Sequence, residues 1–190
     1  QSLPAVRSWP GEARVITYTM CEALARRYNC TGYFRPDIMA IMRADACRYF
    51  ALHQFGGTYA DLDVTLHRKH DDSKCKGLCL WHESNLGTLS NYFIVSRKGN
   101  HCTRNIISAC CKALSHTHMD FHRDPHLIHN TCGPNALTRI ALPCASTIKP
   151  HSDLTKIVSH AVASNTWHNG YPSWLQERMH RAGWSHVYEH

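Results

Sequence analysis

The sequence predicts an α/β fold, because helical and strand patterns alternate along the chain. Apolar residues recur at helical spacing from Ile38 to Leu52, and the aromatic and β-branched run Tyr92–Val95 is typical of a strand. No internal repeat and no low-complexity linker interrupts this alternation. We therefore expect a single domain over residues 1–190 in which helices pack on a sheet.

The first of these elements leads directly to a pair of acids. Pro36 suits the first turn of a helix, and the double glycine at 56–57 suits its end, because glycine tolerates the left-handed conformation there. A strand follows at once. Side chains alternate along a strand, so we expect Tyr59, Asp61 and Asp63 on one face and the apolar residues between and after them in the core.

The later elements follow the same logic. Apolar periodicity predicts a helix over Asn105–Leu114 and another over Ala136–Leu142, the second after a Thr-Cys-Gly-Pro-Asn turn. Short apolar runs predict strands at Leu78–Trp81 and Ile157–Val158. The histidine-rich stretch from 115 to 129 is expected to be a surface loop, with an acceptor-binding role left open.

The composition narrows the choice of partners. The formal net charge is +7 before sixteen histidines are counted, which suits a polyanionic ligand such as a nucleoside diphosphate and also suits ordinary solubility. We find no arginine-rich helix typical of nucleic-acid binding and no apolar run long enough for a transmembrane segment. The chain starts at Gln1 without a charged and apolar leader, so any targeting segment is expected outside it or not at all.

The ten cysteines bear on compartment and on metal binding. An even count, together with the acceptor sequence Asn29-Cys30-Thr31, favours an oxidising lumen of the Golgi or secretory pathway, with a cytoplasmic location as the alternative. Cys75 and Cys79 have the spacing of half a zinc site, but no second half follows. Cys47 is expected to be a buried, unreactive thiol.

Two further residues are expected to join the acids. Asp45 and Arg48 lie three positions apart, hence on one face of the helix, and close enough in sequence to converge on the pocket of Asp61 and Asp63. The alternative is an ion pair of little energetic weight on the helix surface. Hard divalent cations take oxygen ligands and share them with substrate phosphates, so the acids are candidate ligands for such an ion.

The order and spacing of these residues resemble glycosyltransferase family 32 and the related clostridial glucosylating toxins. Two later segments, Thr131–Pro134 and Asn165–Trp174, look like the family's Thr-Gly-Pro turn and its closing histidine followed by Ser-Trp. The first segment carries the following matching positions: Asp45, Arg48, Tyr49, Leu52, Gly56, Gly57, Tyr59, Asp61 and Asp63.

This resemblance implies a GT-A nucleotide-diphospho-sugar transferase fold, a Rossmann-like sheet with helices on both faces. It implies a metal-dependent, retaining transfer of a hexose from a nucleoside-diphosphate sugar to a glycan or other hydroxyl acceptor. Asp61 and Asp63 would be the catalytic pair. Asp63 would ligate Mn2+ or Mg2+, and Asp61 would contact the ribose, the sugar or a metal-bound water. His168 would be the distal metal ligand or a diphosphate contact; otherwise it is an ordinary surface histidine.

The same resemblance assigns the substrate-binding residues. Asp45 and Arg48 would hold hydroxyls of the transferred sugar, and Tyr59 would line the nucleotide pocket. Ser173 and Trp174 would belong to a mobile lid over the diphosphate, although Trp174 could instead pack in the core.

Two alternatives remain open. The family's usual opening strand is not found before Asp45, so the domain is expected to be N-terminally truncated. The first alternative is therefore a catalytically inactive or partial GT-A domain with a binding or structural role. The string Asp61–Leu66 also resembles the first motif of haloacid-dehalogenase-like phosphatases. That interpretation is disfavoured, because the preceding strand is short and the later Gly-Asp-x3-Asp site is missing.

Overall fold

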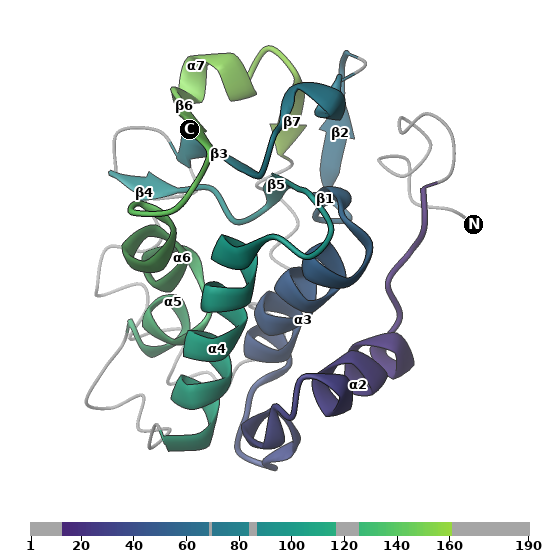
Figure 1. The fold of residues 1–190 in the computed structure, drawn as a ribbon, viewed down its shortest axis with the longest axis vertical. Helices are drawn as coiled ribbons and strands as arrows, with labels where there is room; N and C mark the ends of the chain where they lie inside the picture. The colour runs from purple at the N-terminus through teal and green to yellow at the C-terminus, as the bar shows by residue number, and fades with distance from the viewer. Residues whose placement is uncertain (1–12, 69, 84–86, 117–125, 161–190) are drawn as a thin grey trace.

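The structure is a computed structural model that describes residues 13–68, 70–83, 87–116 and 126–160 (Figure 1). Helix α2 (Tyr18–Arg27) begins after Thr17, whose hydroxyl oxygen accepts a hydrogen bond from the backbone N–H of Met20. A short 3-10 helix, η1 (Thr31–Phe34), leads to helix α3 (Ala40–Phe55).

A five-stranded mixed sheet forms the middle of the molecule. Strands β1 (Gly57–Ala60), β5 (Phe93–Ser96), β3 (Leu78–Glu83) and β4 (Thr88–Leu89) pair in that order, and β6 (Thr147–Lys149) also pairs with β3. The β3–β6 pair is parallel and the others are antiparallel. The predicted α/β class is therefore confirmed, and the mixed sheet with its helices is consistent with a GT-A-like fold.

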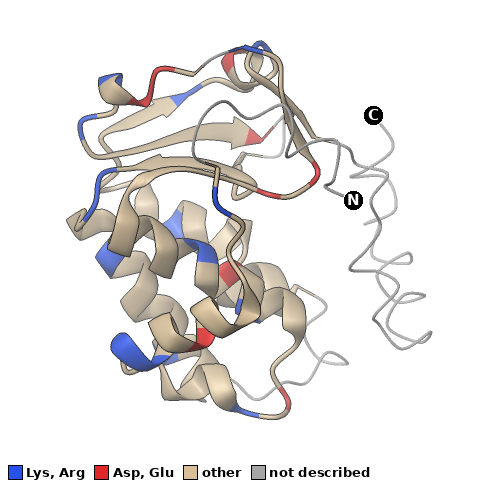
Figure 2. Cartoon of the chain, turned by 90° about the vertical axis from the view of Figure 1, so that its right-hand side faces the viewer, with Lys and Arg blue, Asp and Glu red and all other residues tan. Residues whose placement is uncertain are grey.

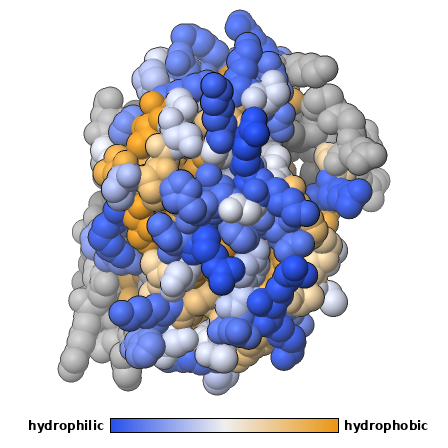
Figure 3. All heavy atoms as spheres, viewed as in Figure 1, coloured by the Kyte–Doolittle hydropathy of each residue, from blue (hydrophilic) through white to orange (hydrophobic). Residues whose placement is uncertain are grey.

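Helices α2 to α6 cover one face of this sheet. Helices α4 (His101–His116), α5 (Leu127–Thr131) and α6 (Pro134–Ala141) pack there together with α2 and α3 (Figure 1). Alternation along β5 explains the arrangement, because Ile94 faces the helices while its neighbours on either side face the opposite layer. Hydrophilic side chains predominate on the side of the molecule seen in Figure 3.

A second, two-stranded sheet covers much of the opposite face. Strands β2 (Val64–Leu66) and β7 (Val158–His160) pair antiparallel, and the short helix α7 (His151–Leu154) packs beside them. Apolar residues of this layer pack against Trp81 and Phe93, and both aromatic side chains are fully buried. Helices thus lie on both faces, as predicted, but only short ones lie on this face.

The structure also corrects some predicted boundaries. The first long helix begins at Ala40 rather than Pro36, because the backbone is extended at Arg35 and again at Met39. Ile38 is buried although it is not helical, so the apolar residue at this position indicates packing in the core and not a helix. The predicted loop over 115–129 is wrong at both ends, since α4 runs to His116 and α5 begins at Leu127. The remaining predicted strands and helices are confirmed to within a few residues.

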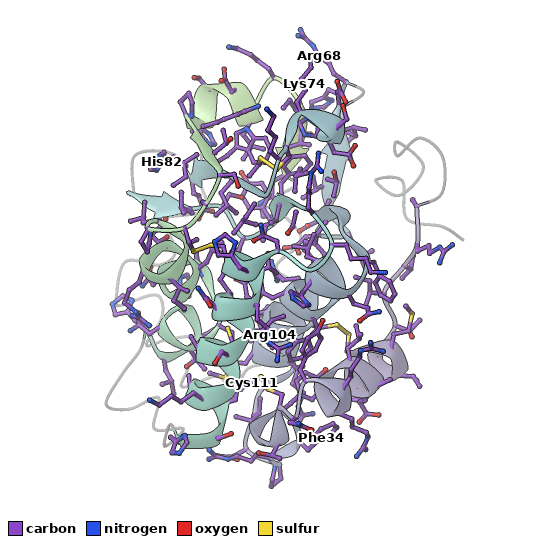
Figure 4. All side chains as sticks on the ribbon, viewed as in Figure 1. Phe34, Arg68, Lys74, His82, Arg104 and Cys111 are labelled. Carbon is purple, nitrogen blue, oxygen red and sulfur yellow. A yellow bond between two sulfur atoms is a disulfide. The ribbon has the colours of Figure 1, made fainter. Side chains whose placement is uncertain are left out.

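Four disulfides link parts of the chain that sequence spacing alone does not pair. Cys75 and Cys79, which have the spacing of half a zinc site, bond to each other. Cys47 is buried, as predicted, but it is not a free thiol, because the packing of α2 against α3 brings it to Cys21 and the two form a disulfide. Figure 4 shows the sulfur atoms in yellow and labels Cys111, whose partner is on η1's N-terminal side. The full set of pairs is Cys21–Cys47, Cys30–Cys111, Cys75–Cys79 and Cys102–Cys144, and Cys110 and Cys132 are buried free thiols.

Among the helices of the described ranges, none combines the length and the apolar composition that a membrane crossing requires.

Candidate functional site

Asp61 and Asp63 lie in the turn that joins the two sheets, since β1 ends one residue before Asp61 and β2 begins one residue after Asp63. The backbone N–H of Asp61 donates to the carbonyl oxygen of Tyr92 at 3.0 Å. The N–H of Val64 then donates to the carbonyl oxygen of Asp61, also at 3.0 Å, which closes the turn. Figure 2 shows acidic positions, in red, along the boundary between the helices and the strands.

The prediction that the acids lie along one strand is therefore wrong. Leu62, expected in the core, is 52% exposed, because the chain turns between the two sheets instead of continuing the ladder with β5. The turn nevertheless keeps both carboxylates on one side, since each offers an oxygen to a common cluster described below.

The predicted convergence of Asp45 and Arg48 on the acids is confirmed. Arg48 Nη2 lies 2.7 Å from Asp45 Oδ1, and Arg48 Nη1 lies 3.3 Å from Asp61 Oδ1. Both Asp45 and Arg48 are only 3% exposed, so the alternative of an ion pair on the helix surface is excluded. Asn91 completes this cluster: its carbonyl oxygen accepts from Arg48 Nη1 at 2.5 Å, and its side-chain amide donates to Asp45 at 3.1 Å.

Burial and neighbouring charges together set the pKa values of Asp45 and Arg48. It raises the pKa of Asp45 to about 6, against the opposing effect of the Arg48 charge. For Arg48, burial works to lower the pKa, but Asp61 and the other neighbouring groups raise it overall to well above its ordinary value. Arg48 is therefore a permanent buried cation that holds two carboxylates in place.

Tyr59 supports the same carboxylate from β1. Its hydroxyl donates a hydrogen bond to Asp61 Oδ1 at 2.7 Å, and the Arg48 guanidinium carbon lies 5.1 Å from the centre of its ring. Burial raises the pKa of Tyr59, so the hydroxyl stays a neutral donor. The predicted role of Tyr59 in the nucleotide pocket stays a prediction; the contact with Asp61 is an additional one.

The sequence did not single out His160, yet this residue reaches the acids. Strand β7 pairs with β2 so that His160 stands opposite Val64, the residue that follows the turn. This register brings His160 Nε2 to 3.3 Å from Asp63 Oδ1. Burial works to lower the pKa of His160, but the hydrogen bond and charge of Asp63, joined by the charges of Asp61 and Glu83, raise it overall. No local motif marked this histidine among the sixteen of the chain.

Tyr92 and Glu83 complete the surroundings of His160. The ring of Tyr92 stacks on the imidazole, with centroids 4.3 Å apart and planes at 14°. Glu83, the last residue of β3, interacts electrostatically with His160 and Asp61, and burial raises the pKa of its carboxyl group. Glu83 ends β3 and Tyr92 directly precedes β5, and neither residue was predicted from the sequence to belong to the site.

The three side chains Asp61, Asp63 and His160 fit a divalent cation. One ligand atom from each can be chosen so that all lie within 4.8 Å of one another. Two donors that are about 2.1 Å from one ion and at right angles to each other lie about 3 Å apart, close to the separation of His160 from Asp63. The two carboxylates suit hard cations such as Mn2+ or Mg2+, whereas imidazole nitrogen is a ligand typical of transition metals.

Three predicted site residues, His168, Ser173 and Trp174, lie outside the described residues, and their roles stay predictions. The expected Thr-Gly-Pro-like turn lies in the described part of the chain, where Thr131 ends α5 and Pro134 is the first residue of α6. This turn contacts α3, because the hydroxyl of Tyr49 donates to the carbonyl oxygen of Cys132 at 3.0 Å.

Part of the chain is similar to a known protein family. Residues 23–76 match the family described as "Glycosyltransferase sugar-binding region containing DXD motif". No curated protein matches the chain well enough to count as a relative. A solved structure titled "PaToxG Glycosyltransferase" is similar at 14% identity and a TM-score of 0.41, over 86% of this chain and 54% of that one. This chain spans about half the length of that protein.

The matched segment contains five residues of the candidate site: the buried Asp45–Arg48 pair, Tyr59 and the two acids of the turn. The narrower assignment to family 32 stays a prediction. Asp61-Leu62-Asp63 is the DXD sequence within the match, and over residues 23–76 the chain is similar to glycosyltransferases that contain a DXD motif.

Proposed function

We propose that this protein transfers a hexose, with retention of configuration, from a nucleoside-diphosphate sugar to a glycan or other hydroxyl acceptor, with the help of Mn2+ or Mg2+. The observation that carries this proposal is the convergence of the DXD acids with a buried arginine and a histidine at one end of β1. Open α/β sheets bind ligands beyond the ends of their strands, where this cluster lies.

The carboxylates of Asp61 and Asp63 would hold the cation, together with oxygens of the donor diphosphate. When bound, such an ion neutralises the charge that develops on the diphosphate leaving group. Asp61 is oriented for this task from two sides, by the hydroxyl of Tyr59 at 2.7 Å and by Arg48 at 3.3 Å. A carboxylate fixed in this way loses little further freedom when it binds its ligand.

Arg48 and Asp45 would contact the transferred sugar. Among the described residues, Arg48 Nε has no hydrogen-bond partner, so the guanidinium keeps one donor for a further acceptor such as a sugar hydroxyl. Asp45 is tied to Asn91 and Arg48, and the pair thus supports the floor of the site on α3.

We also propose a location in the lumen of the Golgi or the secretory pathway. The four disulfides support this proposal, because such bonds persist in oxidising compartments and are rare in the cytosol. A cytoplasmic location is the alternative, and it predicts free thiols in the protein isolated from its own cells.

The proposed function is tested with the full chain, Mn2+ and a panel of UDP- and GDP-sugars, by following donor hydrolysis and transfer. Asp63→Asn should abolish turnover and leave the thermal unfolding curve close to that of the wild type, because the turn keeps its backbone hydrogen bonds. Asp153→Asn is the matched control, since Asp153 lies on α7, pairs with Lys156 just after that helix, and its replacement should not affect turnover.

Two outcomes would count against the proposal. Full turnover by Asp63→Asn would remove Asp63 from the metal site. Wild-type protein that binds a nucleotide with Mn2+ in a thermal-shift assay, but turns over no donor, would favour the inactive or partial GT-A domain.

A further inference from the structure

We propose that Asn29 carries an N-linked oligosaccharide, which is attached before the disulfide between Cys30 and Cys111 closes. Asn29-Cys30-Thr31 is the only Asn-x-Ser/Thr sequence in the chain, and it lies between α2 and η1, away from the acidic turn. This inference rests on the proposed lumenal location. The donor of such a glycan, an oligosaccharide linked to a lipid diphosphate, belongs to the secretory pathway.

The two side chains that define the acceptor sequence lie on the outside of the protein. Asn29 and Thr31 are both exposed, whereas Cys30 between them is 1% exposed and Gly32 is buried. A Cβ atom on Gly32 would lie 2.4 Å from the backbone of Leu114, so η1 packs directly on α4. The buried residues thus anchor this segment, and the side-chain amide of Asn29 is left in solvent, where a bulky glycan is tolerated.

The turn that holds Asn29 also gives a purely structural reason for an asparagine. The N–H of Asn29 donates to the carbonyl oxygen of Arg26 at 3.0 Å, and the N–H of Cys30 donates to that of Ala25 at 2.9 Å, which is a Schellman helix end. Asn29 has a φ of 53°, a left-handed conformation that glycine and asparagine favour. This reason does not extend to the exposed Thr31, so variants that keep the turn separate the two explanations.

The position of the acceptor sequence keeps a glycan clear of the candidate site. Phe34, the last residue of η1, lies near the lower end of the molecule in Figure 4. Figure 1, in the same orientation, shows β1 and β2 in the upper half, and the acidic turn joins these two strands. We therefore expect the glycan to leave donor turnover unchanged.

The order of the chain sets the time at which the glycan is attached. In the folded protein, the helix end and the Cys30–Cys111 disulfide fix the backbone around Asn29, so the segment is not free to enter another enzyme's active site. Cys111 follows Cys30 by 81 residues, which take roughly 4–16 s to synthesise at about 5–20 residues per second. Asn29 thus enters the lumen while Cys30 still lacks its partner.

The transfer itself replaces one bond by another. The side-chain amide nitrogen of Asn29 forms a bond to the anomeric carbon of the oligosaccharide, while the bond from that carbon to the lipid diphosphate breaks. The lipid diphosphate leaves, and the amide nitrogen loses one of its two hydrogens as a proton. No oxidant or reductant takes part.

The test is cell-free synthesis of the full chain with endoplasmic-reticulum microsomes, into which a cleavable signal sequence directs it. We expect the wild type to migrate as a larger species that peptide-N-glycosidase returns to the size of the unmodified chain. That enzyme leaves an aspartate where the glycan was attached, and mass spectrometry should find it in place of Asn29.

Matched variants separate the modification from the helix end. Asn29→Gly keeps the left-handed turn and should lose the larger species, as should Thr31→Val, which leaves Asn29 in place. Thr31→Ser keeps a hydroxyl group and should retain the glycan. Asn105→Gln changes an exposed asparagine of α4 outside the acceptor sequence and should also retain it.

A second experiment tests the order of events. Folded, disulfide-bonded wild type without a glycan is mixed with solubilised microsomes that contain the lipid-linked donor, and it should stay unmodified. The same chain, reduced and unfolded, should accept the glycan at Asn29.

The inference is overturned if the wild type in the microsomal lumen carries no glycan, if Thr31→Val keeps the larger species, or if the folded protein accepts the glycan as readily as the unfolded chain. None of these results bears on the DXD site. Turnover of a nucleotide sugar by the chain without a glycan tests the proposed function separately, and the thiol content of the protein from its own cells tests the location.

Discussion

The buried carboxyl group of Asp45 should leave a measurable mark on the pH dependence of stability. Asp45 is 3% exposed, and burial raises its pKa from the ordinary 3.8 to about 6, despite the nearby charge of Arg48. The Asp45→Asn variant is the informative perturbation, because asparagine has nearly the same shape. Its side-chain oxygen can still accept the hydrogen bond that Asn91 donates in the wild type.

The sign and size of the effect follow from proton linkage. Between pH 4 and pH 6 the unfolded chain releases the Asp45 proton while the folded protein keeps it, so the wild type loses stability as pH rises through this range. A rise in pKa from 3.8 to about 6 is equivalent to about 3 kcal/mol at neutral pH. The asparagine variant lacks this loss. Because the unfolded chain has already released part of this proton at pH 4, the free energy of unfolding of the variant, minus that of the wild type, should increase by about 2 kcal/mol from pH 4 to pH 7.

The assay is urea unfolding of both proteins at several pH values, followed by tryptophan fluorescence with the disulfides intact. Taking the difference between the two proteins cancels the titration of all other groups that the substitution leaves untouched. A difference that stays constant from pH 4 to pH 7, or falls, would refute the reasoning that Asp45 is a desolvated carboxyl group.

Four more outcomes are expected. Alkylation of the denatured, unreduced protein should label the two cysteines outside the disulfides, as mass spectrometry would show, and a different number of labels would contradict the pairing. Gly56→Ala should lower the free energy of unfolding by more than about 1 kcal/mol, because φ is +72° and a Cβ atom would lie 2.7 Å from a backbone nitrogen. Gly57→Ala has φ of +91° but open space around it, so chemical denaturation should show a smaller loss than for Gly56→Ala. Tyr59→Phe removes the hydrogen bond to Asp61 and should reduce donor turnover severalfold with little change in the unfolding temperature; unchanged kinetics would show that Asp61 needs no such support.

The local pattern around the acids was largely readable in advance. Helical spacing placed Asp45 and Arg48 on one face of α3, and the double glycine correctly marked its end, where Gly56 adopts a positive φ. The same pattern failed one step later, at Asp61. The alternation of side chains predicted that the strand continues through the acids. In the structure, the chain turns there, with a hydrogen bond from the N–H of Val64 to the carbonyl oxygen of Asp61, and enters a different sheet.

The burial of these side chains was harder to predict from the sequence than their position on the helix. An ion pair with this spacing can lie on a helix surface or inside a core, and only the packing of the sheet over α3 makes the Asp45–Arg48 pair a buried one. Cys47 shows the same limit, since its partner Cys21 lies on another helix and the spacing along the chain does not reveal the bond.

The sequence by itself determined the α/β class, the DXD acids and the helix that carries Asp45 and Arg48, because these depend on residue types a few positions apart. Only the tertiary structure brought His160 and Tyr92 to Asp61 and Asp63. The β2–β7 and β1–β5 ladders make that contact between segments far apart in the chain, and their register is set by packing of the two layers. Short-range periodicity carries no record of such pairing, so the side chains that complete the site were visible only in the fold.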